Sequence, residues 1–392
     1  MSKRKVLILS DAPTTTTGLG KITRELATRM SAMPEIEVAT LGIGRFTSRH
    51  LPFHQYLISN LDGRDMIPPN LEDVCKDFFG GERGVLFTIM NPGWLTWLAF
   101  PEVLPECSLK RFLQSKPFET WAYLPMDAEG PLGKVPLEIA TIIQKFDRIL
   151  AYSGWQADMI ERTLNIPCPN LPHGTDASIF YPRNKEEARN NFLSVVLGKD
   201  MPTMDKRIFL VGVTATNTPR KDWALAFHVC RILKDRGVRV GLWAHFDVLK
   251  KHWDIQALQV EYGLEGAVIS TTRSLTDDEM ARAYSACSVM LGIGNFEGWG
   301  LTMSEALACG VPVVHGRGGG GREFIPNEML VDPIGYYNEG VYCHQRGCFK
   351  ASDWADRTEH SSSLADGFSL LDARFYWSNC WPEWEQWIKD GL

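Results

Sequence analysis

The sequence predicts an α/β protein with two doubly wound parallel sheets, and three observations support this prediction. Short, nearly continuous apolar runs recur along the chain, and several of the stretches between them have the apolar spacing of amphipathic helices. Strands that alternate with helices form parallel sheets covered by helices. A polar stretch over residues 181–205 interrupts this pattern, which then starts again. With 392 residues, 44% of them hydrophobic, the chain can form two domains with a core each.

The first half begins with a strand, a glycine-containing loop and a helix. Residues 6–9 are apolar and lead into Ser-Asp-Ala-Pro, and residues 22–30 follow with helical spacing. Further buried strands are expected at 37–41, 84–89, 119–124 and 148–152, and helices at 137–146 and 156–164. We assign residues 1–180 to an N-terminal Rossmann-like domain and 181–205 to a linker.

The second half repeats this organisation over residues 206–370, which we assign to a C-terminal Rossmann-like domain. Strands are expected at 207–213, 238–244, 267–270, 288–292 and 311–315, and helices at 223–235, 277–286 and 303–308. Residues 371–392 carry Trp377, Trp381, Trp384 and Trp387 at three- and four-residue spacing. This stripe predicts a helix that packs its aromatic face on the body of the protein, with a carbohydrate-binding platform as the alternative.

Composition and charge restrict the class of protein. The 41 basic and 47 acidic residues give a net charge of −6, which argues against a general polyanion binder but leaves a local basic patch open. Nine cysteines without a repeated metal-ligand spacing indicate thiols in a reducing compartment, and we predict no metal site. The apolar run after Lys3-Arg4-Lys5 ends too early for a signal peptide. No uninterrupted apolar stretch of the sequence approaches the ~20 residues that a membrane-spanning helix needs. We therefore expect a cytoplasmic protein.

The most informative motif holds two glutamates eight positions apart, Glu297 and Glu305. Between them lie a Gly-Trp-Gly turn and the first turn of a predicted helix, which together expose backbone N–H groups to an anion or a polyol. Carboxylates can accept hydrogen bonds from the vicinal hydroxyls of a sugar. The ordinary alternative is that Glu297 complements the helix dipole and Glu305 is solvated.

The whole string, Glu-Gly-Trp-Gly-Leu-Thr-Met-Ser-Glu-Ala-Leu-Ala-Cys-Gly-Val-Pro-Val-Val, resembles the E-x7-E region of retaining GT-B glycosyltransferases of the family 4 type. The resemblance implies two Rossmann-like domains facing a central cleft, a nucleoside-diphosphate sugar (most often a UDP-sugar) as co-substrate, and no metal cofactor. It places Glu297 by the donor sugar hydroxyls and Glu305 on the nucleotide ribose. It also implies donor contacts from the backbone of the turn, which comprises Gly298, Trp299, Gly300 and Leu301.

The loop at 213–223 resembles the family's diphosphate-binding loop, in which an Arg and a Lys hold the phosphates. Lys221 matches that Lys by its place in Pro-Arg-Lys-Asp, whereas the usual Arg falls near Ala215 or Thr216 and is missing. Arg220 is a weaker candidate for its replacement. We class Lys221 with the catalytic residues, as we do Glu297, because a fixed cation stabilises the charge that develops on a departing phosphate.

Five further residues are candidates on weaker grounds. Gly18 and Gly20 would let backbone approach a diphosphate closely, and His315 ends a predicted strand beside a glycine-rich loop on the donor side. Asp127 also ends a predicted strand, where it could orient or deprotonate an acceptor hydroxyl; a plain turn aspartate fits equally well. His173 lies in Pro-His-Gly-Thr-Asp, which resembles a family turn, and is an acceptor-side candidate although such residues are usually structural.

The acceptor is the least determined partner. The segment 45–56 interleaves cations, among them Arg45 and Arg49, with aromatic residues, a combination that can hold phosphates and stack on bases. A solvated loop is the ordinary reading. Because viral enzymes that glycosylate modified DNA bases share the GT-B architecture, DNA with hydroxymethylated pyrimidines is the alternative acceptor, by analogy. A module that binds a nucleotide sugar or glycan without turnover is a second alternative.

Overall fold

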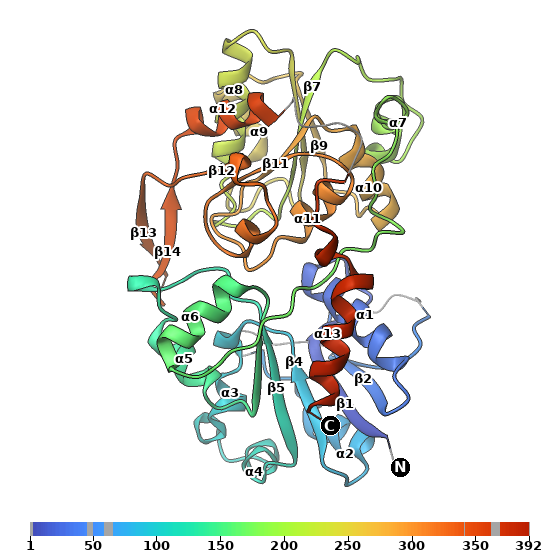
Figure 1. Cartoon of the computed structure of the whole chain (residues 1–392), viewed down its shortest axis with the longest axis vertical. Helices are drawn as coiled ribbons and strands as arrows, with labels where there is room; N and C mark the ends of the chain where they lie inside the picture. Colours follow the sequence, from blue (N-terminus) through green and yellow to red (C-terminus); the bar gives the residue numbers. More distant parts are fainter. Residues whose placement is uncertain (1–2, 45–49, 59–65, 341, 362–368, 392) are drawn as a thin grey trace. The chain divides into compact units, whose positions relative to one another are not determined.

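The chain forms two compact units, each with its own six-stranded sheet (Figure 1). The computed structural model describes residues 3–44, 50–58, 66–340, 342–361 and 369–391. Unit 1 comprises Met1–Pro172, Gly340–His344 and Pro382–Leu392, and unit 2 comprises His173–Glu339 and Gln345–Trp381. All the strand pairs of the two large sheets are parallel. The predicted pair of Rossmann-like parallel sheets is confirmed.

The sheet of unit 1 has the order β3-β2-β1-β4-β5-β6. Its strands are β1 (Arg4–Asp11), β2 (Ile36–Ile43), β3 (His54–Ile58), β4 (Gly84–Thr88), β5 (Phe118–Leu124) and β6 (Arg148–Ala151). The helices are α1 (Gly18–Ser31), α2 (Leu71–Phe79), α3 (Thr96–Ala99), α4 (Ser108–Gln114), α5 (Leu137–Ile143) and α6 (Gly154–Leu164). The order reverses between β1 and β4, and ligands of such sheets bind at the carboxyl ends of the strands beside this reversal.

Unit 2 repeats the same arrangement in the order β12-β11-β10-β7-β8-β9, so that its order reverses between β7 and β10. Its strands are β7 (Phe209–Thr214), β8 (Val240–His245), β9 (Val268–Thr271), β10 (Val289–Gly292), β11 (Val313–Gly316) and β12 (Leu330–Val331). The helices are α7 (Lys185–Leu197), α8 (Trp223–Asp235), α9 (Ile255–Glu261), α10 (Asp277–Ala286), α11 (Leu301–Ala308) and α12 (Ala351–Ser361). A separate two-stranded sheet joins β13 (Gly335–Glu339) and β14 (His344–Cys348).

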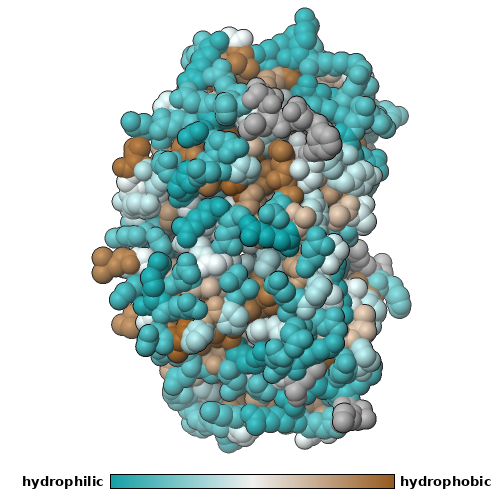
Figure 2. Space-filling model, in the orientation of Figure 1, coloured by the Kyte–Doolittle hydropathy of each residue, from teal (hydrophilic) through white to brown (hydrophobic). Residues whose placement is uncertain are grey.

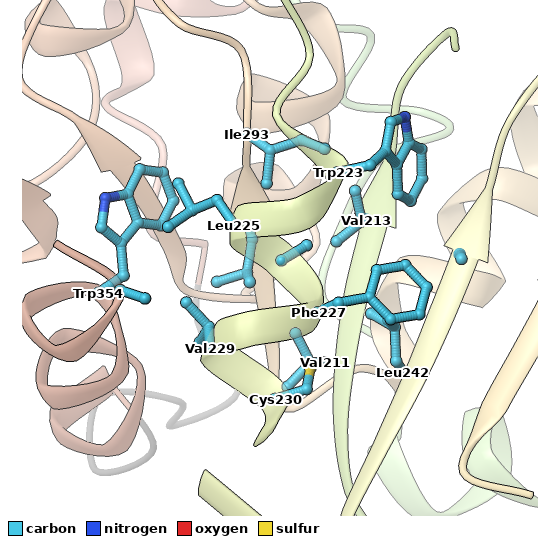
Figure 3. Close-up of a cluster of buried hydrophobic side chains, with 14 of the residues drawn as sticks. Val211, Val213, Trp223, Leu225, Phe227, Val229, Cys230, Leu242, Ile293 and Trp354 are labelled. Atoms are coloured by element: carbon cyan, nitrogen blue, oxygen red, sulfur yellow. The ribbon is translucent and has the colours of Figure 1, made fainter. Parts of the chain in front are cut away.

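The core of unit 2 holds α8 between the sheet and α12. Figure 3 shows Leu225 and Val229 on the side of α8 that faces Trp354, and Phe227 on the side that faces Leu242 of β8. All five side chains are buried, and burial of each large apolar side chain contributes about 1.5–3 kcal/mol. This packing fixes the start of α8, which directly follows the loop of the candidate diphosphate-binding residues.

Some elements differ from the sequence-based expectation. The polar stretch expected as a linker contains α7, which belongs to unit 2. Asn184 caps this helix by accepting a hydrogen bond from the backbone N–H of Glu187 at 3.0 Å, and Phe192 and Val196 are buried. The first turn of α7 is charged and only a narrow face of the helix is apolar. The composition of this stretch therefore predicted a linker between the domains and no helix.

The C-terminal helix α13 (Trp377–Lys389) packs its tryptophans into the protein, as predicted. Within unit 1, the Trp384 indole is completely buried, donates to the Pro172 carbonyl at 2.9 Å and meets the Tyr123 ring edge-to-face at 4.8 Å. The Arg148 guanidinium lies 4.2 Å from the Trp387 ring centre and donates to the Trp387 carbonyl at 2.9 Å. Because these rings serve internal packing, they do not offer a carbohydrate platform.

Replacing Trp384 with Ala should lower the free energy of unfolding by about 3–5 kcal/mol, since it removes a buried indole and leaves a cavity. The measurement is urea denaturation followed by circular dichroism. Glu383→Ala, at an exposed position of the same helix, is the control and should change stability by less than about 0.5 kcal/mol. Equal stability of both variants would contradict this account of α13.

Candidate functional site

The candidate site in unit 2 centres on one carboxylate held by two cations. The Lys221 ammonium is hydrogen-bonded to Glu297 Oε1, and an Arg220 guanidinium nitrogen lies 3.0 Å from the same oxygen. The Lys221 and Glu297 side chains are each 13% exposed, and that of Arg220 is 29% exposed. The fold thus brings together three residues that the sequence analysis singled out separately.

The backbone brings these side chains together because β7 and β10 are neighbours at the reversal of strand order. The loops that follow them therefore leave the same edge of the sheet. Lys221 pairs with Gly294 in an isolated bridge, and the Asn295 N–H donates to the Arg220 carbonyl at 3.0 Å. A side chain at Gly294 would displace the Glu297 carboxylate from this position.

A buried asparagine braces the loop before Lys221. The backbone N–H of Asn217 donates to the Asp247 carboxylate at 2.7 Å, and its side-chain amide donates to the carbonyls of Val248 and Trp253 at 3.0 and 2.8 Å. Its amide oxygen accepts from the Trp253 N–H at 2.8 Å. Sequence reasoning missed Asn217 because its partners lie in a distant loop and follow no motif.

The Gly-Trp-Gly turn leads into α11 through Gly300, whose φ of 101° lies in the left-handed region that favours glycine. Trp299 is buried, with its ring 5.1 Å from that of His173 and 4.8 Å from that of Phe324. The Trp299 side chain therefore anchors the turn. Backbone N–H groups of the turn and of the first turn of α11 are the groups suited to an anion.

Glu305 is buried inside α11 and accepts a hydrogen bond from the Tyr284 hydroxyl at 3.2 Å. Burial, together with the Glu305 charge, holds the pKa of Tyr284 well above its usual range, so this phenol stays a neutral donor. The solvated Glu305 considered as the ordinary alternative is not what the structure shows.

His315 lies at the end of β11 and is completely buried. Its Nδ1 lies 2.5 Å from the Gly292 carbonyl; since a carbonyl only accepts, Nδ1 carries the proton. Burial lowers its pKa to about 4, and the Lys221 charge adds to this effect. At neutral pH His315 is uncharged, and its Nε2 edge faces Gly321, where an added Cβ would lie 3.4 Å away.

The glycine-rich loop after β11 packs against the backbone of Glu297. The Gly320 N–H donates to the Glu297 carbonyl at 2.8 Å, and a side chain at Gly319 would collide with that carbonyl. This loop therefore also fixes the backbone of Glu297.

His173 lies in unit 2, beside the Gly-Trp-Gly turn. It is buried against Trp299, and burial lowers its pKa to about 3. Gly174 after it has no room for a side chain, since a Cβ would collide with the Trp377 backbone. An acceptor-side role for His173 stays a prediction.

Three further candidates lie in unit 1. Gly18 begins α1, and a side chain at Gly20 would collide with the Thr15 hydroxyl and lie 2.7 Å from the Ala12 carbonyl. Gly20 is thus required by the packing of its own loop, whatever that loop binds. Asp127 follows β5, as expected for a residue at the carboxyl end of a strand. Arg45 and Arg49 lie outside the described residues.

A carboxylate that sequence reasoning did not single out ends β1. Burial raises the pKa of Asp11, and the Thr17 hydroxyl donates to its carboxylate at 2.5 Å. The same signal that pointed to Asp127, an acidic residue at the carboxyl end of a buried strand, would have found it.

Over the described ranges, no group of three or more His, Cys, Asp and Glu side chains is arranged to hold a metal ion. The helices of that same part of the chain all lack the combined length and apolarity needed to cross a membrane.

Comparison with solved structures identifies the architecture. The chain is similar to sucrose-phosphate synthase from Thermosynechococcus elongatus, with a TM-score of 0.71 and 17% identity over 99% of both chains. It is also similar to Anabaena HepE in complex with UDP and glucose, with a TM-score of 0.69 and 14% identity over 99% of this chain and 100% of HepE. The chain has the GT-B fold of glycosyltransferases. The catalytic domain of Arabidopsis thaliana starch synthase IV, bound to ADP and acarbose, matches with a TM-score of 0.64 and 12% identity over 98% and 99% of the two chains.

Sequence comparisons also find similarity to glycosyltransferases. Residues 251–333, which include Glu297, Glu305 and His315, match the family model "Glycosyl transferases group 1". A probable sucrose-phosphate synthase of Thermosipho melanesiensis is 21% identical over 218 residues. That match covers 55% of this chain and 45% of the relative, so it spans less than half of the relative's length.

The buried His173 should make stability depend on pH. The pKa of His173 is about 6.5 in the unfolded chain and about 3 in the folded chain. Below pH 6.5 the unfolded chain therefore binds a proton that the folded chain does not bind, and the free energy of unfolding decreases as the pH is lowered. Between pH 7 and pH 5 this one group should cost about 2 kcal/mol of unfolding free energy. His173→Asn should remove that part of the pH dependence, measured by urea denaturation at both pH values.

The control for this measurement is His228→Asn, at an exposed position on α8, which should keep the pH dependence of the wild type. An unchanged pH dependence in His173→Asn would show that His173 is not buried as a neutral side chain.

Proposed function

We propose that the chain is a retaining, metal-independent glycosyltransferase that moves a sugar from a nucleoside-diphosphate sugar, in the first place a UDP-sugar, to a hydroxyl group of an acceptor. The observation that carries this proposal is the meeting of Lys221 and Arg220 on the Glu297 carboxylate, directly before the amides that open α11. The GT-B fold and the group 1 family match over residues 251–333 support it.

Departure of a nucleoside diphosphate develops negative charge on the β-phosphate. Lys221, Arg220 and the N–H groups of residues 298–301 are preorganised to stabilise that charge, which is the main source of rate in such sites. Arg220 takes the place of the arginine that the loop lacks near residues 215–216. Because both cations contact Glu297, diphosphate binding exchanges carboxylate for phosphate on Lys221.

The exchange frees the Glu297 carboxylate to accept hydrogen bonds from the hydroxyls of the donor sugar. Glu305, oriented by the neutral Tyr284 phenol, binds the ribose hydroxyls of the nucleotide. His315 remains neutral and offers its Nε2 as an acceptor to the donor.

For retention, the acceptor attacks the anomeric carbon on the face that the diphosphate leaves. The new bond joins the acceptor oxygen to the anomeric carbon as the bond to the phosphate oxygen breaks, and the acceptor proton passes to the departing phosphate. This balance requires neither a protein nucleophile nor a metal. In this proposal Asp127 orients the acceptor hydroxyl.

The direct test measures release of nucleoside diphosphate from a panel that begins with UDP-glucose and ADP-glucose, chosen because HepE and starch synthase IV were solved with UDP-glucose and with ADP. Proton NMR of the product gives its anomeric configuration. Tight donor binding without release from any donor would favour the non-catalytic module, and an inverted product would overturn retention.

DNA containing hydroxymethylated pyrimidines is the alternative acceptor. Of the basic and aromatic segment, residues 45–49 lie outside the described residues, and His54–Ile58 forms the edge strand β3. The Tyr56 hydroxyl is hydrogen-bonded to Asp77, so that hydroxyl already has a partner within the protein. Duplex binding that weakens steeply with salt would support DNA, and absence of binding at low salt would exclude it.

Replacing Glu297 with Ala should lower turnover by more than about tenfold, because the hydroxyls of the donor sugar lose the carboxylate that accepts their hydrogen bonds and orients the sugar. The measurement is the initial rate of nucleoside-diphosphate release at saturating donor. Glu328→Ala, at an exposed position of the same unit, is the control and should keep the wild-type rate. A wild-type rate in Glu297→Ala would refute this assignment of the site.

A further inference from the structure

The two-stranded sheet of β13 and β14 is bonded to the turn that carries Glu297. The family match ends at residue 333, so both strands follow the matched region in the sequence. Figure 1 shows them standing apart from the six-stranded sheet of unit 2. None of the donor contacts proposed above involves a residue of either strand. A contribution of this small sheet to the site therefore has to come from its contacts with the turn.

Asn295, two residues before Glu297, forms this connection. Its side-chain amide donates to the Gly347 carbonyl at 2.7 Å, and its amide oxygen accepts from the Gly347 N–H at 2.8 Å. The Arg346 guanidinium donates to the Asn295 carbonyl at 3.0 Å. Asn295, Arg346 and Gly347 are all buried, so these hydrogen bonds are shielded from water. They fix the Asn295 backbone relative to β14.

Arg346 has a defined place because a buried cation needs a partner. Its side chain is only 4% exposed, and its Nε donates to the Glu339 carboxylate of β13 at 2.7 Å. On the face that Figure 2 shows, hydrophilic residues cover most of the surface, and ion pairs between exposed side chains contribute little to stability. A buried guanidinium that bonds a carboxylate and a carbonyl at once has a fixed orientation. Arg346 thus connects both strands to Asn295.

The backbone between Asn295 and Glu297 is strained. Phe296 has a φ of 68°, in the left-handed region that costs energy for a residue with a side chain. Its ring is buried, and a side chain at Gly318 would collide with it. A residue keeps such a conformation only where its surroundings impose it, and such residues concentrate at functional sites. The bonds of Asn295 on one side of Phe296 and those of Glu297 on the other supply this constraint.

We propose that Arg346 is a positioning residue for the glycosyl transfer: through Asn295 it holds the strained turn that directs the Glu297 carboxylate. This inference rests on the proposed function. Asn295 also donates its N–H to the Arg220 carbonyl, so the same residue joins β14 to the loop of the two cations. Without Arg346, Phe296 can relax to an ordinary backbone conformation. The Glu297 carboxylate then turns away from the hydroxyls of the donor sugar, and the sugar is no longer oriented.

The test is the turnover of Arg346→Met, which removes the guanidinium and keeps an apolar side chain. With UDP-glucose or ADP-glucose, whichever the wild type turns over faster, kcat for nucleoside-diphosphate release should fall about fivefold or more. The donor KM should stay within about twofold, because the phosphate contacts are retained. Arg346→Lys keeps the charge without the planar fork and should lie between the two. Arg207→Met, at an exposed arginine paired with Asp205 in the same unit, should behave as the wild type.

A positioning role through Glu297 has a second consequence, which a general loss of stability would not produce. In the Glu297→Ala background, Arg346→Met should change kcat by less than about twofold, because the carboxylate that Arg346 positions is absent. Asn295→Ala, which removes both side-chain bonds to Gly347, should lower kcat in the same way as Arg346→Met. It replaces Arg346→Met in the comparison if that variant does not fold.

Two kinetic results would overturn the inference: a wild-type kcat in the folded variant, or an equal loss of kcat with and without the Glu297 carboxylate. A crystal structure of Arg346→Met gives a readout that needs no turnover. In it the Glu297 carboxylate should lie away from the Lys221 ammonium, and a carboxylate still bonded to Lys221 would also overturn the inference. If the wild type turns over no donor, the proposed function fails, and this structure alone decides whether Arg346 positions Glu297.

Discussion

Two cations that share one carboxylate oxygen form the interaction on which the candidate site depends. Lys221 and Arg220 reach Glu297 only because the loops after β7 and β10 leave one edge of the sheet and are bonded to each other through Gly294 and Asn295. Glycines at 294 and 319 make room for this approach. The apolar core around α8, shown in Figure 3, fixes the helix that follows the Lys221 loop. The hydrogen bonds of the Asn217 side chain fix the part of this loop that precedes Lys221.

The charge balance of this cluster explains how two partly buried cations can lie beside each other. Partly buried charges are costly unless they are paired. Two cations and one carboxylate leave one positive charge in excess, and the amides at the start of α11 add to it. His315 stays neutral and adds no charge. In the proposed function, this excess of positive charge binds a diphosphate, which replaces Glu297 on Lys221.

Apolar periodicity was sufficient to predict the two sheets and half of the helices that the structure describes around them. Helices α8 and α10 begin and end at the predicted residues, because each has strong apolar spacing and a side-chain cap. The elements that were missed, such as α7 and β3, are polar on the outside or lie at a sheet edge, where long-range contacts decide the structure. In the site, motif spacing located Glu297 and Lys221. Motif spacing does not reveal contacts between residues that are far apart in the sequence. Three such contacts are the ion pair of Arg220 with Glu297, the hydrogen bond of the Asn217 side chain to Trp253, and the packing of His173 against Trp299.

The most direct test of the central claim is the affinity of Glu297→Gln for UDP, measured by isothermal titration calorimetry beside wild type and the exposed control Glu328→Gln. UDP carries the diphosphate without the sugar, so loss of the sugar contact does not enter the comparison. If Glu297 and the diphosphate compete for Lys221 and Arg220, removal of the carboxylate charge should tighten UDP binding by about fivefold, corresponding to a part-buried ion pair of about 1 kcal/mol. Unchanged or weaker binding of UDP by Glu297→Gln would contradict the claim.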